Sequence, residues 1–93
     1  MGFHFEFDLE KAVGNTIKHG VSFAEAQTVF LDPLALEAPD PEHSMQEERL
    51  LLVGRSVRQR LLVVVFTERG DSIRIISARE ATRHEKRIYE EGS

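Results

Sequence analysis

ERLLLVGRS, at Glu48–Ser56, is the first of three strand-like stretches, and RLLVVVF (Arg60–Phe66) and SIRIISAR (Ser72–Arg79) follow it closely. Consecutive strands joined by turns of a few residues pair as an antiparallel meander. The middle stretch contains three successive valines at positions 63–65. An uninterrupted apolar run of this kind predicts a central strand that is covered on both faces.

Alternation along each strand predicts which side chains share a face, because successive side chains point to opposite sides of a sheet. The predicted groups are Arg49, Leu51, Val53 and Arg55 in the first strand, and Ile73, Ile75, Ser77 and Arg79 in the third. Arginines therefore stand at the ends of apolar faces, where a guanidinium group reaches the rim of the sheet.

The chain before this sheet begins with a strand and a helix. Phe3–Asp8 alternates apolar and polar residues, which predicts a half-buried strand. Asp8 is a good N-cap for a helix over residues 9–19, and Gly20 ends that helix. The apolar stripe that we expect to face inward consists of Leu9, Val13 and Ile17, with Ala12 and Thr16 beside it.

A second short helix and a polar connection follow. Ser22 and Glu25 have the spacing of a capping box at the start of this helix, and Asp32-Pro33 ends it. Leu34–Ala38 is expected to form a short strand. Pro39–Ser44, which is acidic and rich in proline, predicts a loop.

The terminal segment predicts a last helix, which a second capping box at Thr82 and Glu85 begins. The resulting order is β-α-α-β-β-β-β-α. It predicts a single α+β domain over residues 1–93, with the helices packed on one antiparallel sheet.

Charge is distributed unevenly along the chain. The formal net charge is −4, but ten of the twelve basic residues lie between Arg49 and Arg87, together with only four acidic ones. Residues 1–48 contain ten acidic residues against Lys11 and Lys18. Since binding depends on the local patch of charge, this asymmetry favours an anionic partner for the second half despite the acidic average.

Other features narrow the class of protein. The chain has no cysteine, which excludes disulfides and thiolate chemistry and suits the reducing cytoplasm. The longest apolar run, Leu61–Phe66, is far shorter than the roughly 20 residues of a membrane-spanning helix. The N-terminus lacks the basic and apolar regions of a signal peptide. We also expect no cofactor and no bound metal, because the histidines and acidic residues lack ligand spacing.

The clustered arginines have two interpretations. Arginine is suited to bidentate recognition of phosphate, so several on one surface form a candidate RNA or DNA backbone site. The alternative is a solvated face on which arginines pair with acidic residues across the sheet. Lys18-His19 likewise has two interpretations. The pair is either two basic residues that a helix C-terminus favours, or a phosphate-binding lysine beside a proton-transfer histidine.

The sequence resembles the BrnT toxin family over nearly its whole length. The matching motifs occur in order: F-E-F-D at Phe5–Asp8 with K-A at Lys11-Ala12, N-x-x-K-H-G-V-S-F-x-E-A at Asn15–Ala26, V-F-x-D-P at Val29–Pro33, D-P-x-H-S at Asp40–Ser44, E-R at Glu48-Arg49, G-R-S at Gly54–Ser56, L-L-V-V-V-F-T-E-R-G at Leu61–Gly70, I-R-I-I-S-A-R at Ile73–Arg79, and A-T-R-x-E-x-x-x-Y-E at Ala81–Glu90.

This resemblance implies a fold similar to the RelE-like ribonucleases and a toxin of a bacterial type II toxin–antitoxin system. Such a toxin cuts RNA, halts translation, and is neutralised by a ribbon-helix-helix antitoxin in a hetero-oligomer. The complex represses its own operon, so the toxin reaches DNA only through the antitoxin. The alternative is a degenerate toxin that binds the antitoxin and co-represses without cutting RNA.

RNA cleavage without a metal requires activation of the 2′-hydroxyl, stabilisation of the pentavalent phosphorane and a proton for the 5′-oxygen. We expect Arg49, Arg55 and Arg79 to bind the phosphate with help from Lys18, and His19 to transfer protons, with Glu85 second if its capping role leaves an oxygen free. The expected RNA-binding residues are Arg58, Arg60, Arg69, Arg83, Lys86, Arg87 and Tyr89.

Overall fold

The computed structural model describes residues 3–42 and 48–92, so positions 43–44 of the expected acidic loop lie outside the described residues. The elements are β1 (His4–Glu6), α1 (Leu9–His19), α2 (Phe23–Thr28), the 3-10 turn η1 (Val29–Leu31), β2 (Leu36–Pro39), β3 (Leu50–Arg55), β4 (Leu61–Arg69), β5 (Ser72–Glu80) and α3 (Arg83–Glu91). This order confirms the predicted α+β class.

The five strands form one sheet in the order β1-β5-β4-β3-β2. The neighbours β2–β3, β3–β4 and β4–β5 are antiparallel, as the meander predicted, whereas β1 pairs parallel to β5. The sheet is therefore mixed rather than purely antiparallel. β4 is its central strand, and Val63 and Val64, which point to opposite faces, are both almost fully buried.

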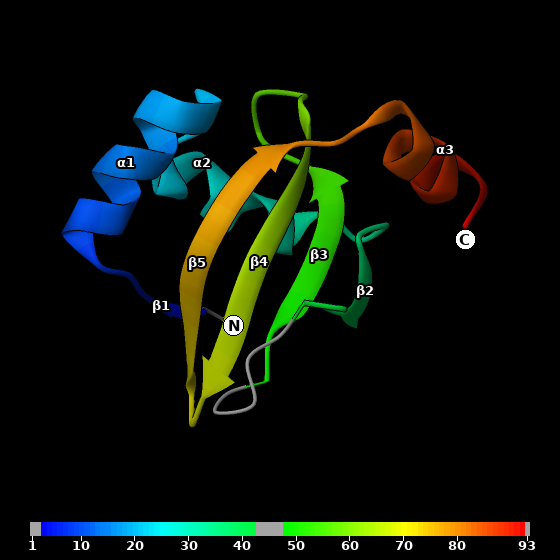
Figure 1. Cartoon of the computed structure of the whole chain (residues 1–93). Helices are drawn as coiled ribbons and strands as arrows, with labels where there is room; N and C mark the ends of the chain where they lie inside the picture. The colour runs from blue at the N-terminus through cyan, green and yellow to red at the C-terminus, as the bar shows by residue number, and fades with distance from the viewer. Residues whose placement is uncertain (1–2, 43–47, 93) are drawn as a thin grey trace.

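The hydrophobic core lies on one face of the sheet, under α1 and α2 (Figure 1). Phe23 and Ala26 of α2 pack there against strand residues, and the ring of Phe30 meets that of Phe66 edge-on with 5.0 Å between centroids. No helix of the described residues covers the centre of the opposite face, and α3 lies beside β3 at one end (Figure 1). We call this opposite side the open face.

The expected inward stripe of α1 is wrong. Leu9, Val13 and Ile17 are 73%, 60% and 81% exposed, while Asn15 is buried. The helix caps occur as predicted, with Asp8 accepting backbone hydrogen bonds and Gly20 in the left-handed region at φ 70°. Periodicity finds the apolar side of a helix but does not show that this side contacts the same chain. Here the polar Asn15 faces inward because its amide binds backbone groups there.

The predicted grouping of side chains in β5 is also wrong, because the strand contains a β-bulge. Val65 pairs with Ser77 and Phe66 pairs with Ile75, which leaves Ile76 as an extra residue. An extra residue reverses the alternation beyond it. Ile73 and Ile75 therefore face the core, whereas Ser77 and Arg79 line the open face.

Only half of the capping box expected at α2 is present. The Ser22 hydroxyl accepts the N–H of Glu25 at 3.0 Å. The Glu25 carboxylate is instead buried and receives hydrogen bonds from Ser56 and from two nitrogens of Arg60. Arg60 also donates to the carbonyl of Gly20 at 3.0 Å. Together these contacts of Arg60, the residue before β4, join the end of α1 and the start of α2 to the sheet.

We predict that Arg60→Met lowers the free energy of unfolding by roughly 3 kcal/mol, because it leaves a buried carboxylate without its main partner. The hydrogen bond from Arg60 is the largest cause of the lowered pKa of Glu25. Chemical denaturation at neutral pH measures the effect. Arg69→Met, which breaks an exposed contact of 3.7 Å with Glu6, is the matched control and should cost less than about 1 kcal/mol. Equal stability of the two variants would refute the role of Arg60.

Candidate functional site

A hollow of about 460 Å³ opens on the open face beside the end of β5. Its walls come from the end of α1, the segment after β2, the start of β3, the centre of the sheet, β5 and α3. The lining residues are His19, Asp40, Pro41, Glu42, Arg49, Leu51, Val65, Ser77, Arg79 and Glu85. Four of the six predicted catalytic residues, His19, Arg49, Arg79 and Glu85, therefore meet in one place.

Arg79 and Glu85 form a bidentate ion pair in this hollow. Nη1 and Nη2 of Arg79 each donate to one carboxylate oxygen of Glu85, both at 2.8 Å. Glu85 also accepts the N–H of Thr82 at 2.8 Å, which completes the predicted capping box of α3. The hydrogen bonds from Arg79 are the largest cause of a pKa of about 2 for Glu85, against the opposing effect of burial. The pair fixes the start of α3 to β5.

Arg49 lies at the floor of the same hollow, just before β3. Its Nε is buried and has no hydrogen-bond partner in the described part of the chain. Leaving a buried charged donor without an acceptor is costly, so this nitrogen needs a structural or functional explanation. Because Nε itself is shielded from solvent, a bound anion would meet Arg49 at the part of the residue that lines the hollow.

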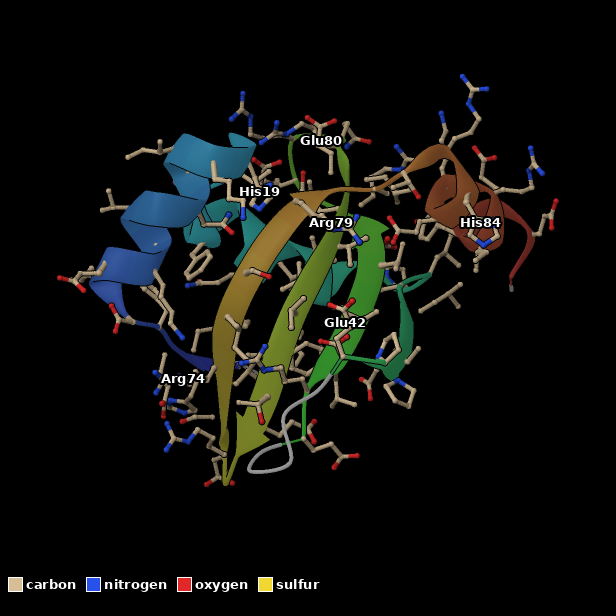
Figure 2. All side chains as sticks on the ribbon, viewed as in Figure 1. His19, Glu42, Arg74, Arg79, Glu80 and His84 are labelled. Atoms are coloured by element: carbon tan, nitrogen blue, oxygen red, sulfur yellow. The ribbon has the colours of Figure 1, made fainter. Side chains whose placement is uncertain are left out.

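The place of His19 follows from how α1 is attached. The Asn15 amide donates to the carbonyls of Val21 and Ala78, both at 2.8 Å, and accepts the N–H of Ala78 at 3.0 Å. This contact holds the end of α1 against β5, next to Arg79. His19 then reaches the hollow, whereas Lys18, one residue earlier, is exposed. Figure 2 shows His19 and Arg79 near the same end of β5.

Arg55 lies outside this hollow, in a separate cluster that anchors α3. Its guanidinium lies 5.7 Å from the centre of the Tyr89 ring. The Tyr89 hydroxyl donates to Asp32 at 2.7 Å, and the N–H of Arg55 donates to the same oxygen at 2.7 Å. Burial acts to raise the pKa of Asp32, but these hydrogen bonds and that of Leu34 outweigh it and leave the pKa below its ordinary value.

The predicted RNA-binding residues do not form one patch. Arg58 and Arg60 lie near Glu25 at the turn between β3 and β4, and Arg69 lies at the opposite end of β4. Tyr89 is held by Asp32. Three cations on α3 are exposed to solvent, namely Arg83, Lys86 and Arg87.

Two acidic residues of the hollow, Asp40 and Glu42, were not among the predicted site residues. Asp40 and Glu42 follow β2, and Asp40 accepts the N–H of Glu42 at 3.0 Å. Their acidity marks them in the sequence only as a solvated loop, and nothing local to that loop indicates that it borders Arg49 and Arg79. Asp32 was missed for a similar reason, because Arg55 and Tyr89, which it binds in the cluster that anchors α3, lie 23 and 57 positions away.

Two features are absent from the described residues, a metal-binding group and a membrane-spanning helix. Within positions 3–42 and 48–92, no three histidine or acidic side chains are grouped so that they would hold a metal ion. None of the helices in that part of the chain has the length and apolar character needed to cross a membrane.

Comparison with known proteins identifies the family. Among solved structures, the chain is similar to the Brucella abortus ribonuclease toxin BrnT, with a TM-score of 0.66 and 25% sequence identity over 88% of this chain and 100% of that one. Among curated proteins, none matches the sequence at a significant level. The model of the ribonuclease toxin BrnT of type II toxin–antitoxin systems matches residues 7–85, which is most of the chain. The chain therefore belongs to the BrnT family of ribonuclease toxins of type II toxin–antitoxin systems.

Proposed function

We propose that this chain is a metal-independent endoribonuclease whose reacting phosphate binds in the hollow between Arg49 and Arg79. The observation that carries the proposal is that Arg49, just before β3, and Arg79 of β5 line the same hollow. A phosphate bound between the two guanidinium groups would gain charge as the phosphorane forms. Fixed cationic donors directed at developing charge are a large source of catalysis.

Arg79 retains donors for a phosphate although it is paired with Glu85. A guanidinium group has five N–H donors. In the described structure, Nη1 uses two of them, on Glu85 and on the Glu80 carbonyl, and Nη2 uses one on Glu85. The remaining donors, on Nε and Nη2, are the ones we assign to the substrate. Glu85 is then a positioning residue rather than the general base, because its low pKa makes it a poor proton acceptor.

The other predicted residues receive narrower proposed roles. We assign Lys18 and the exposed cations of α3, Arg83, Lys86 and Arg87, to the RNA backbone on either side of the hollow. Contacts of this kind give affinity that is independent of sequence and weakened by salt. We assign Arg55 and Tyr89 to anchoring α3, and Arg60 to the ion pair with Glu25, in place of direct RNA contact. Arg58 and Arg69 remain candidates for contacts with the RNA backbone farther from the hollow.

In the cell, we propose that cleavage of RNA by this chain inhibits translation in the cytoplasm. A ribbon-helix-helix antitoxin would form a hetero-oligomer with it and occlude the hollow, and that complex would repress the operon. Membership of a toxin–antitoxin family supports the existence of the antitoxin. An open reading frame for a small ribbon-helix-helix protein beside this gene is the observation that checks the antitoxin type.

One observation favours a second candidate, a non-catalytic toxin that only binds its antitoxin and co-represses. Glu85 neutralises much of the charge of Arg79, which leaves Arg49 to carry most of the attraction for phosphate. Under this alternative, the purified wild-type chain cuts no RNA and its induction does not arrest growth.

We predict that Arg49→Gln and Arg79→Ala each lower the rate of RNA cleavage by on the order of 10²-fold, because each removes a donor to the phosphorane. The rate is measured with purified protein and single-stranded RNA, with and without EDTA, which should have no effect. Growth arrest on induction of the gene should disappear with the same substitutions.

Arg74→Gln is the matched control for these variants. Arg74 also lies on β5 and on the open face, but outside the hollow, and Figure 2 shows it well away from Arg79. The control removes the same charge from the protein and should cleave RNA at nearly the wild-type rate. Full activity of Arg49→Gln, or equal losses in all three variants, would contradict the proposed phosphate site.

The Arg79–Glu85 pair also predicts a dependence of stability on pH. A carboxylate whose pKa falls from 4.5 to about 2 on folding stabilises the protein above its unfolded pKa, and this contribution is lost as the pH falls toward 2. Because Arg79 is 40% exposed, solvent screening reduces the contribution, and we expect Glu85→Gln to cost about 1–2 kcal/mol at pH 7.

Denaturation at several pH values between 2 and 7 tests this expectation. The loss of stability on acidification should be smaller in Glu85→Gln than in the wild type. Glu90→Gln, an exposed carboxylate on the same helix, should retain the wild-type slope. If the two variants have the same slope, the ion pair does not contribute as proposed.

A further inference from the structure

The hollow contains two groups that are free to transfer protons. In the described structure, Asp40 accepts a hydrogen bond from the backbone of Glu42, and both oxygens of Glu85 bind Arg79. The carboxylate of Glu42 and the ring of His19 have no such partner among residues 3–42 and 48–92. Glu42 is exposed, so a change there does not disturb the core.

These two groups enter the hollow from different elements. His19 ends α1, which is attached to β5, whereas Glu42 follows β2 at the other edge of the four-strand run β5-β4-β3-β2. Figure 2 shows His19 and Glu42 on different sides of Arg79. Attack on phosphorus by the 2′-oxygen and departure of the 5′-oxygen occur on opposite sides of the phosphorus atom. A base on one side of the phosphate and an acid on the other is the arrangement this requires.

We propose that Glu42 is the general base of this ribonuclease and His19 its general acid, an inference that rests on the proposed RNA cleavage in the same hollow. The Glu42 carboxylate accepts the proton of the 2′-hydroxyl as the 2′-oxygen attacks phosphorus. The bond from phosphorus to the 5′-oxygen breaks, and the His19 imidazolium donates a proton to that oxygen. The products are a 2′,3′-cyclic phosphate and a 5′-hydroxyl. Glu42 gains one proton and His19 loses one, so the total charge is unchanged and no other reactant is needed.

The direction of transfer follows from the chemistry of the two side chains. An ionised carboxylate has only acceptors, so it takes a proton but does not supply one. A protonated imidazole donates from either nitrogen. Between them lie Arg49 and Arg79, which stabilise the charge on the non-bridging oxygens but exchange no proton, because arginine stays protonated.

A substrate with sulfur in place of the 5′-oxygen separates the two roles. A thiolate leaves without being protonated, so loss of the general acid matters much less with this substrate, whereas loss of the base matters equally. A synthetic single-stranded RNA is first used to find one bond that the wild-type protein cuts. The same RNA is then made with a 5′-bridging sulfur at that bond, and single-turnover rates are measured for both.

Glu42→Gln is expected to lower the rate by about 10²–10⁴-fold with both substrates. His19→Gln is expected to lower the rate of the oxygen substrate over a similar range, about 10²–10⁴-fold, and to approach the wild type with the sulfur substrate. Glu37→Gln is the matched control, since Glu37 is an exposed carboxylate on β2 that lines a different hollow. It should cleave both substrates at the wild-type rate. Circular dichroism and thermal melting confirm that each variant is folded at the assay temperature.

The outcomes distinguish this inference from the function on which it rests. A wild-type protein that cuts none of the RNAs overturns the proposed ribonuclease activity and the inference with it. An active wild type with an equally active Glu42→Gln variant overturns the role of Glu42 alone. Rescue of Glu42→Gln, rather than His19→Gln, by the sulfur substrate overturns the assignment of base and acid.

Discussion

The amide of Asn15 holds the first helix against the last strand, and most of the candidate site depends on it. β1 pairs only with residues 72–74 of β5, so within positions 3–42 and 48–92 the later part of β5 has no neighbouring strand on that side. There the Asn15 side chain binds both the N–H and the carbonyl of Ala78, as a neighbouring strand would. A buried amide that satisfies three backbone groups is strongly favoured to stay in place. Its position fixes the C-terminal end of α1 beside β5, and hence brings His19 close to Arg79 in the hollow.

The β-bulge at Ile76 has a complementary effect on the same strand. Before it, β5 supplies isoleucines to the core; after it, the alternation is reversed and Arg79 lies on the open face. Without the extra residue, Arg79 would point toward the helices, where a charge without a partner is costly. The bulge therefore lets one strand serve the hydrophobic core at one end and the hollow at the other.

The local features of this fold were accessible from the sequence, and the long-range ones were not. Helix caps at Asp8, Gly20 and Thr82 and the three-strand meander depend on neighbouring residues, so their patterns identify them. The partner of Glu25 could not be predicted in this way, because its capping-box spacing fits a local role while its carboxylate binds Arg60, 35 positions away. The apolar pattern of β5 does not reveal that the strand contains a bulge. For the same reason, the charge excess identified the basic segment but not which arginines are already paired.

The charges inside the hollow indicate how affinity and catalysis are divided under the proposed function. Its lining contains two arginines and one histidine, but also three carboxylates, on Asp40, Glu42 and Glu85. Such a surface does not attract a polyanion strongly by net charge. The cations of α3 and Lys18 are exposed outside the hollow, and contacts of these residues with the RNA backbone would supply salt-dependent affinity. The hollow then acts on a single phosphate of an RNA that is already bound. Glu85 orients Arg79 there, and Arg49 lines the same hollow. Substitutions in the hollow should therefore act mainly on kcat and those on α3 mainly on KM, because only interactions that strengthen in the transition state raise kcat.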